Sequence, residues 1–325
     1  MKINFAFIII CFYSLFPDYT YSQGEWNNWI FGHHAGITFN SGPPVPITTV
    51  ASAYWARGDQ VTVSDSLGNL LFYAENNLYK SGYVFNRNNI QMPNGHLFDN
   101  NDQNNPQPLF AVQNPADDSV YYIFQMMNPN PSGTGGLYYS ILDMRLDGAL
   151  GDIVPGQKSI RIYSGRYTAN VLTGTRHYNN KDAWIIVRNH TDSDTYLSYL
   201  VNSSGIDTIP VYSPSLFTAD SNFNMVSHMK ISPDGTKLIC LADSNAEYCS
   251  FNSMTGVITH LFKIYCHPNQ HFYQFGDAEF SIDNKYLYIT EGQSASSGSK
   301  LYQIDATKTD SAEFKQSQVL ICSEP

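Results

Sequence analysis

The sequence predicts an all-β protein, a β-propeller built from four-stranded antiparallel blades. Residues 59–95 hold four short runs of β-forming residues separated by Gly-, Asn- and Asp-rich turns, which is typical of an antiparallel meander. The first hairpin of this meander recurs four times, with central turn residues 49 to 62 residues apart. Propeller blades repeat at about 40 to 50 residues, whereas β-sandwich domains need about 100 residues each. The five central turn residues are Gly68, Asp118, Asn180, Gly235 and Asn284.

The composition is typical of an extracellular β protein. Of the 325 residues, 14% are charged and 42% are hydrophobic, and the chain contains 23 Tyr and 19 Phe. This balance argues against a disordered chain. The formal net charge is −10, and no cluster of Lys and Arg is present that could neutralise phosphates. The composition therefore predicts that the protein does not bind nucleic acid.

Residues 1–22 have the features of a secretory signal peptide. Lys2 supplies a positive start, and residues 5–16 form an apolar run that is too short to span a bilayer. No other segment is apolar for long enough to be transmembrane. We therefore expect a signal peptide at 1–22, a β-propeller domain at 23–325, and an exported protein located outside the cell or on its outer surface.

The N-terminal part of the domain predicts an incomplete blade. Residues 29–31 and 37–39 are two short β runs, and the prolines that follow suit a surface connection or an edge strand. We expect the missing strand to come from the other end of the chain, as is common in propellers. His33 and His34 are neighbours, so on a strand they would point to opposite faces. They indicate a turn and not a metal site.

Two further segments look at first like ligand loops. Asp99 and Asp102 lie in a polar stretch, but the spacing and closing Glu of a calcium loop are missing. Gly148 and Gly151 lie in a turn-rich hook over 146–152, without the spacing or the following helix of a phosphate loop. We therefore expect connecting loops at both places.

The third meander carries the side chains that most resemble a catalytic set. Arg176 and His177 precede a tight turn, and Asp182 and Trp184 follow it. No Ser or Cys nucleophile can be tied to them by spacing, so a structural or binding role is the favoured interpretation.

The fourth meander contains a well-defined turn at 232–235 (Ser-Pro-Asp-Gly) and a candidate disulfide. A hairpin centred between Ser244 and Asn245 would place Cys240 directly opposite Cys249. An exported protein can form such a bond. Two small buried thiols that face each other without bonding are the open alternative.

The fifth meander begins at 278 and ends with a strand at 318–322, three residues before the chain stops. The count is therefore about five meanders plus a partial N-terminal blade, which could belong to a seven-bladed ring. No closing strand is visible, so we expect a C-terminally truncated propeller whose open blade edges can associate.

Several stretches resemble a known family. NWIFGHHAGITFNSGPPV (28–45) and GLYYSILDMRLDGALGDI (136–153) are similar to the N-terminal propeller-like region of large secreted Bacteroidetes proteins associated with gliding motility and type IX secretion. VSDSLGNLLFYAEN (63–76) also matches, whereas the stretch at 227–238 is generic to propellers. The resemblance implies export, a propeller fold and a surface or adhesive setting. It carries no catalytic residues, and the C-terminal sorting domain of that family is absent here.

Two function classes remain open at the level of sequence. The first is a secreted or cell-surface binding or adhesion module, whose abundant Tyr and Trp side chains could contact a glycan or a protein. The second is an extracellular enzyme that degrades polysaccharides or peptides at the propeller channel, with residues that converge only in space. The sequence shows no catalytic, cofactor-binding or metal-binding motif, so binding is the favoured prediction.

Overall fold

The structure, a computed structural model, contains strands, turns and a few short helices. The residues it describes are 24–31, 34–51, 60–76, 82–97, 109–127, 135–163, 168–189, 195–216, 226–242, 245–265, 273–293 and 299–323.

The first three sheets follow one another along the chain, and we number them blades 1 to 3. Blade 1 contains β1 (Asn28–Phe31), β2 (Ala35–Thr38) and β3 (Val45–Ile47), and a 3₁₀ turn, η1 (Gly24–Trp26), precedes it. Blade 2 contains β4 (Gln60–Ser64), β5 (Leu70–Asn76), β6 (Gly82–Asn86) and β7 (Gln91–His96). Blade 3 contains β8 (Leu109–Asn114), β9 (Asp117–Met127) and β10 (Gly136–Asp143), and β10 pairs with two short outer strands, β11 (Asp152–Ile153) and β12 (Ile160–Tyr163).

Blades 4 to 6 repeat the same order. Blade 4 contains β13 (Thr168–Arg176), β14 (Ala183–Asn189) and β15 (Thr195–Asn202), and its outer position is again shared, by β16 (Gly205–Ile206) and β17 (Val211–Pro214). Blade 5 contains β18 (Val226–Ile231), β19 (Lys237–Ala242), β20 (Asn245–Phe251) and β21 (Ile258–Tyr265). Blade 6 contains β22 (Tyr273–Phe280), β23 (Tyr286–Gln293), β24 (Lys300–Asp305) and β25 (Val319–Ser323).

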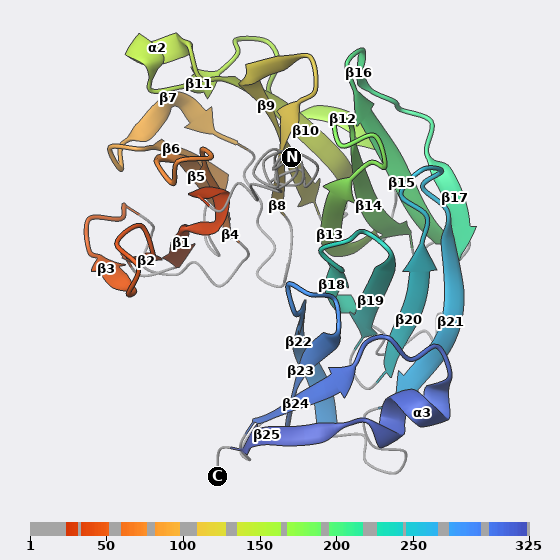
Figure 1. Cartoon of the computed structure of the whole chain (residues 1–325). Coiled ribbons are helices and arrows are strands. Elements are labelled where there is room, and N and C mark those ends of the chain that lie inside the picture. Colours follow the sequence, from red (N-terminus) through yellow and green to blue (C-terminus); the bar gives the residue numbers. More distant parts are fainter. Residues whose placement is uncertain are drawn as a thin grey trace, which may run out of the picture.

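These six antiparallel sheets form a six-bladed β-propeller. In Figure 1 the first strand of blades 2 to 6 lies nearest the centre, and the later strands lie progressively farther out. The prediction of an all-β propeller with four-stranded antiparallel blades is confirmed. The predicted five meanders and partial N-terminal blade correspond to six blades among the described residues, so the suggestion of a seven-bladed ring is too high by one blade.

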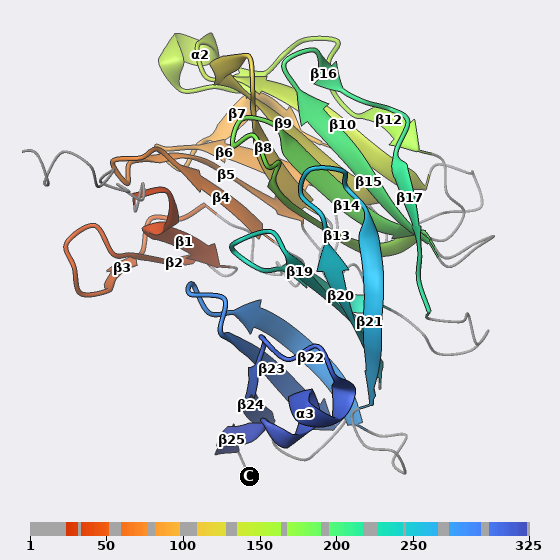
Figure 2. The ribbon, with the colours of Figure 1, turned by 45° about the vertical axis from the view of Figure 1, so that its right-hand side comes forward.

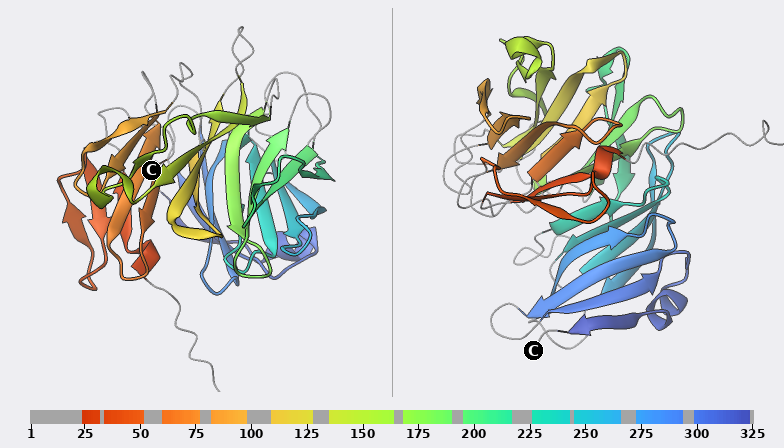
Figure 3. Two further views of the ribbon diagram at one scale, coloured as in Figure 1. Left: turned by 90° about the horizontal axis from the view of Figure 1, so that it is seen from above. Right: turned by 60° about the vertical axis from the view of Figure 1, so that its left-hand side comes forward.

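The described blades trace an arc and do not meet at its two ends. Figures 1 and 3 show blade 6 and blade 1 on either side of an opening. Blade 1 has three strands among the described residues, and β25 pairs with β24 in blade 6, so the strand expected from the other end of the chain does not complete blade 1 there. β25 is exposed along its whole length, including Val319, Leu320 and Ile321. Association through such open edges stays a prediction.

Neighbouring blades are held together by apolar layers, and β19 shows how the sequence encodes them. Its residues Leu238 and Cys240 pack in the core between blades 4 and 5, whereas Ile239 and Leu241 pack between blades 5 and 6. Successive side chains of a strand point to opposite faces, so a strand such as β19, whose blade is covered on both faces, is apolar at most positions. Each fully buried side chain of this kind contributes about 1.5 to 3 kcal/mol.

Most of the predicted turns lie where the sequence placed them. Gly68, Asn180, Gly235 and Asn284 all have positive φ values, between 57° and 86°. Gly tolerates this left-handed conformation and Asn is enriched in it, which explains their recurrence at the first hairpin of each blade. Asp118 is the exception, because it lies within β9. The turn of blade 3 is formed by residues 115 and 116, which directly precede β9.

The predicted register of the β19–β20 hairpin is wrong. The last pair of the ladder is Ala242 with Asn245, so the hairpin is centred one residue earlier than expected. That shift places Cys249 opposite Leu238 and Cys240 opposite Glu247. Cys240 and Cys249 are both buried and both free thiols, but neither lies directly opposite the other as both sequence interpretations required. Burial raises the pKa of Cys240 to about 12 and that of Cys249 well above its usual value.

The described residues contain very little helix. α2 (Leu146–Ala149) is the turn-rich hook that the sequence predicted, with positive φ values at Asp147 and Gly148. α3 (Ser311–Gln316) was not predicted, and Figure 2 shows it beside β21 and β24. Phe314 of α3 is buried in the core between blades 5 and 6. No helix in this part of the chain has the length and hydrophobicity that crossing a bilayer would require.

Candidate functional site

The turn between β20 and β21 is held in shape by hydrogen bonds among its own residues. Asn252 Oδ1 accepts hydrogen bonds from the N–H groups of Met254 (3.0 Å) and Thr255 (3.2 Å), and Gly256 N–H donates to Asn252 O (2.8 Å). Gly256 has a φ of 73°, in the left-handed region that favours glycine. A Cβ at this position would also meet the ring of Trp184 at 2.7 Å. Glycine is therefore required here both by conformation and by space.

The neighbouring turn of blade 4 anchors this hairpin. Trp184 Nε1 donates a hydrogen bond to Ser253 O (2.8 Å), and Tyr178 N–H donates to the same oxygen (3.1 Å). His177 Nε2 lies 3.2 Å from Met254 O. Loops that are fixed by a rigid scaffold in this way are the usual location of binding sites in propellers and other β proteins.

The anchored hairpin forms a hollow of about 580 Å³ on the surface of blade 5. Six of its eight lining side chains carry a hydroxyl or an amide, and none is charged. Thr255 and Thr259 are exposed. The lining residues are Thr236, Ser250, Phe251, Asn252, Ser253, Thr255, Val257 and Thr259.

Apolar residues belong to the same wall. Val257 lines the hollow and is 40% exposed, and Met254 of the same turn is 56% exposed. Tyr178, whose N–H donates to Ser253 O, is 66% exposed. The hollow can therefore donate and accept hydrogen bonds and offer apolar contact as well. Its lining includes no His, Asp, Glu, Lys or Cys, so the hollow itself has no general acid, general base or activated nucleophile.

A second polar assembly lies near the centre of the ring, between the innermost strands of blades 5 and 6 (Figure 1). His228 Nε2 of β18 lies 2.9 Å from Asp277 Oδ1 of β22, and Lys230 Nζ lies 2.6 Å from Glu279 Oε2. Burial alone would raise the pKa of Asp277, but the contact with His228 outweighs it and holds the pKa below its usual value. Each acid is thus paired with a base across the seam between the two blades, an arrangement that ties the blades together.

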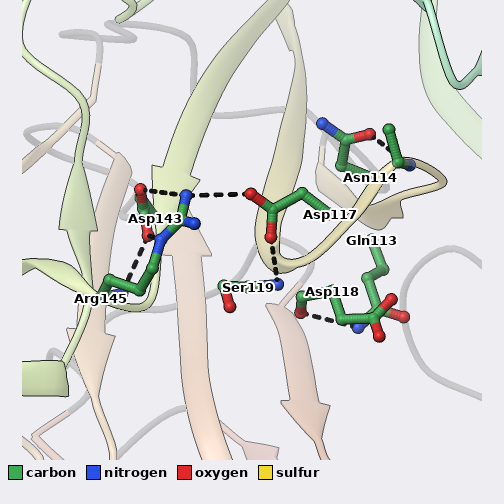
Figure 4. A network of polar contacts seen from close by, with 8 residues as sticks. Gln113, Asn114, Asp117, Asp118, Ser119, Asp143 and Arg145 are labelled. Carbon is green, nitrogen blue, oxygen red and sulfur yellow. Dashed lines mark hydrogen bonds and ion pairs between the residues drawn. The ribbon is translucent and has the colours of Figure 1, made fainter.

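A third polar network lies on blade 3, at the ends of β9 and β10. Figure 4 shows Arg145 between Asp143 and Asp117. Its Nε and Nη2 donate to the two oxygens of Asp143 at 2.9 and 2.8 Å, and Nη2 lies 2.9 Å from Asp117 Oδ2. The hydrogen bonds from Arg145 hold the pKa of Asp143 below its usual value. Because two carboxylates already engage this guanidinium, the network is not an anion-binding site.

Side chains that could ligate a metal gather at a fourth place, between blades 4 and 5. Glu247 and Cys249 of β20 and His260 of β21 offer a carboxylate oxygen, a sulfur and a ring nitrogen that all lie within 4.8 Å of one another. In the described part of the chain this is the group with metal-ligand character. Its residues are 2 and 11 positions apart, which matches no short metal-binding motif.

The residues singled out in the sequence have varied positions. His34 has a φ of 60° and its Nδ1 lies 2.8 Å from Val50 O, so it is a turn residue as predicted. Asp182 Oδ2 accepts a hydrogen bond from Asn179 Nδ2 (2.7 Å), while Arg176 lies 3.6 Å from Glu25. The third meander therefore does not form a catalytic set around His177, which instead supports the wall of the hollow. His33, Asp99 and Asp102 lie outside the described residues.

The hollow itself was missed in the sequence. Its hydroxyl side chains come from the end of β20, the turn that follows, the start of β21 and, with Thr236, the turn between β18 and β19; Ser and Thr are ordinary at such places. The only signal was the density of Ser, Thr and Asn between 250 and 259.

Comparisons with known proteins reveal the fold alone. No protein-family model matches the chain. No curated protein shows detectable sequence similarity. Among solved structures, a protein of unknown function from Desulfotomaculum acetoxidans aligns with a TM-score of 0.51 at 12% identity, over 89% of this chain and 77% of that one. A Lactobacillus plantarum protein aligns with a TM-score of 0.51 at 11% identity, over 89% and 76%. The periplasmic gluconolactonase of Pseudomonas aeruginosa aligns with a TM-score of 0.50 at 12% identity, over 90% and 76%.

Proposed function

We propose that this chain is an exported, non-enzymatic β-propeller that binds a neutral, hydroxyl-rich ligand such as a glycan in the hollow of blade 5. The observation that carries the proposal is the lining of that hollow, which offers six hydroxyl or amide side chains and no charge. The hairpin that forms it is anchored to blade 4, so binding would cost little ordering of the protein.

The chemistry of the lining suits a sugar. Sugar hydroxyls both donate and accept hydrogen bonds, as Ser, Thr and Asn side chains do. The C–H faces of sugar rings are apolar and can pack against Val257, an exposed apolar residue of the lining. A charged ligand would require an opposite charge in the lining, and none of the eight residues provides one.

The setting of this binding activity is the outside of the cell. The signal-peptide features of residues 1–22 and the resemblance to gliding-motility-associated propellers support export and a role in adhesion or surface attachment. An open, shallow hollow on a rigid ring suits repeated, reversible contact with a surface polymer.

An array of neutral and acidic glycans, followed by titration of the best binder, tests the proposal. Thr255→Val and Thr259→Val replace a hydroxyl by a methyl of similar size and leave the hairpin in place. If each hydroxyl makes one hydrogen bond to the ligand, each change removes about 1 kcal/mol of binding free energy, which is about a five-fold rise in Kd. Thr208→Val is the matched control, because Thr208 is an exposed threonine in the connection between β16 and β17.

Neutral glycans should dominate among the binders, and affinity should change little between low and high salt. Binding restricted to acidic glycans, or equal affinities for the Thr259→Val and Thr208→Val variants, would show that the hollow is not the site.

A polysaccharide- or peptide-degrading enzyme is the second candidate. The observation in its favour is the convergence of His228, Lys230, Asp277 and Glu279 near the ring centre. The Pseudomonas aeruginosa gluconolactonase, an enzyme, has the same fold at 12% identity. If this candidate holds, the purified protein cleaves a polymer and His228→Asn abolishes cleavage without lowering the unfolding midpoint.

A further inference from the structure

Glu247 is a buried carboxylate at the seam between blades 4 and 5, with 0% exposure. Its Oε2 accepts hydrogen bonds from Tyr196 Oη (2.9 Å) and Ser215 Oγ (2.6 Å), and its Oε1 accepts one from Leu216 N–H (3.0 Å). His260 Nδ1 lies 2.9 Å from the same Oε1. Donors next to or within blade 4 thus hold both oxygens of the carboxylate, and Oε1 also faces His260 of blade 5.

A thiol completes this arrangement. Cys249 lies two residues after Glu247 on β20, so both side chains project from the same face of the strand. Cys249 is also the cross-strand partner of His260 on β21. One oxygen, one sulfur and one imidazole nitrogen therefore converge from two adjacent strands, all within 4.8 Å of one another.

We propose that Glu247, Cys249 and His260 form a binding site for a divalent transition-metal ion, with zinc as the best fit. A carboxylate, a thiolate and an imidazole are the three side-chain groups that zinc takes in proteins. A hard ion such as Mg²⁺ or Ca²⁺ prefers oxygen ligands alone. The sulfur and the nitrogen in this set therefore argue against such an ion.

The ligand atoms lie close to the spacing that an ion requires. Atoms bound to one zinc at about 2.0 to 2.3 Å lie about 3.3 to 3.8 Å apart in a tetrahedron, and the three ligand atoms here lie within 4.8 Å of one another. If His260 binds through Nδ1 and Glu247 through Oε1, these two atoms, now 2.9 Å apart, move slightly apart. Tyr196 and Ser215 already fix the carboxylate, as the outer partners of metal ligands commonly do.

The charges and the access route also fit. Binding forms bonds from zinc to the carboxylate oxygen, the sulfur and the ring nitrogen. It breaks the S–H bond of Cys249, whose proton passes to the solvent. His260 binds in its neutral form through the nitrogen without a proton; where that is Nδ1, the proton it shares with Glu247 moves to Nε2. The carboxylate and the thiolate then neutralise the divalent ion. The His260 side chain is 22% exposed, which provides a path from solvent and leaves room for water as a fourth ligand.

This inference does not rest on the proposed function, although both concern one hairpin. Ser250 and Thr259, which line the hollow, directly follow Cys249 and directly precede His260 in the sequence. Adjacent residues of a strand point to opposite faces, so the ion would lie behind the hollow. It would tie β20 to β21 and stabilise the hairpin.

Titration of the purified chain with Co²⁺, and competition with Zn²⁺, tests the site. We expect one Co²⁺ per chain with the near-ultraviolet absorption of a cobalt–thiolate bond, displacement by Zn²⁺, and a thermal unfolding midpoint that rises with zinc concentration. Cys249→Ala should remove the thiolate absorption. His260→Gln should weaken binding at least about ten-fold, the smaller cost seen when even an outer partner of a metal site is removed.

Cys240→Ala is the matched control, because Cys240 is an equally buried thiol on the adjacent strand and lies outside the trio. It should retain the cobalt absorption, as should Cys322→Ala, which removes an exposed thiol. If Cys249→Ala does not fold, the partly exposed His260 still provides the test. Absence of a thiolate band in the parent, or its loss in Cys240→Ala or Cys322→Ala, would overturn the proposal.

Discussion

The hydrogen bond from the Tyr196 hydroxyl to Glu247 links blades 4 and 5 at their buried seam, and its removal tests how much that link stabilises the fold. Tyr196 is 0% exposed, and its Oη donates a hydrogen bond of 2.9 Å to the carboxylate of Glu247. Burial raises the pKa of Tyr196 well above its usual value, so the hydroxyl stays protonated and remains a donor. Tyr196→Phe removes this bond, together with the weaker contacts of the hydroxyl to the thiols of Cys240 and Cys249, and leaves the ring packed.

The expected cost follows from the charge of the acceptor. A hydrogen bond to a charged group contributes about 1.5 to 3 kcal/mol, and a neutral one about 0.5 to 1.5 kcal/mol. Since Ser215, Leu216 and His260 still contact the carboxylate, we expect Tyr196→Phe to lower the free energy of unfolding by about 2 kcal/mol.

Urea unfolding followed by Trp fluorescence measures this difference, with Tyr248→Phe as the matched variant. Tyr248 is equally buried, but its Oη donates to a neutral acceptor, Ala306 O, at 2.7 Å. We expect Tyr248→Phe to cost about 1 kcal/mol. A cost for Tyr196→Phe that is equal to or below that of Tyr248→Phe would refute the idea that a charged hydrogen bond holds this seam.

Two further predictions concern stability: one compares two glycines with positive φ values, Gly148 of α2 and Gly256 beside the hollow, and the other concerns Asp277 on the inner strand β22. Gly148→Ala, at a φ of 64° with nothing within 4 Å, should cost about 1 to 2 kcal/mol of stability from backbone strain. Gly256→Ala should lower the melting temperature by more, because its methyl also meets Trp184 at 2.7 Å; equal shifts would contradict this. The pKa of Asp277 lies below its usual value in the folded protein, so its contribution to stability is present above about pH 4 and is lost as the pH falls further. Asp277→Asn should therefore flatten the decline of unfolding free energy on acidification; an unchanged pH profile would show that the contact with His228 does not stabilise the fold.

The fold was largely predictable because each blade repeats a local signal. The turns at Gly68, Gly235 and Asn284 need positive φ values, which the sequence reveals through residue type alone. α3 was missed because six residues are too few to show helical periodicity, although Asp310 caps it by accepting hydrogen bonds from the N–H groups of Ala312 and Glu313.

The register and the sites were less predictable, for a different reason. The sequence around the β19–β20 turn reads Asp-Ser-Asn-Ala over 243–246, and these residues suit a turn in more than one frame. A shift by one residue in its centre changed the partner of Cys249 from Cys240 to Leu238. Glu247, Cys249 and His260 come together through the pairing of two strands and the packing of two blades. No rule about spacing along the sequence predicts such a set.

The footprint of a bound glycan tests the central claim most directly. Hydrogen–deuterium exchange, measured with and without the best neutral glycan from the array, reports which backbone segments the ligand protects. Ligand binding in the hollow of blade 5 predicts protection at 250–259 and at Thr236, with little change elsewhere. Protection confined to the innermost strands β18 and β22 would contradict the account and would favour a site at the centre of the ring.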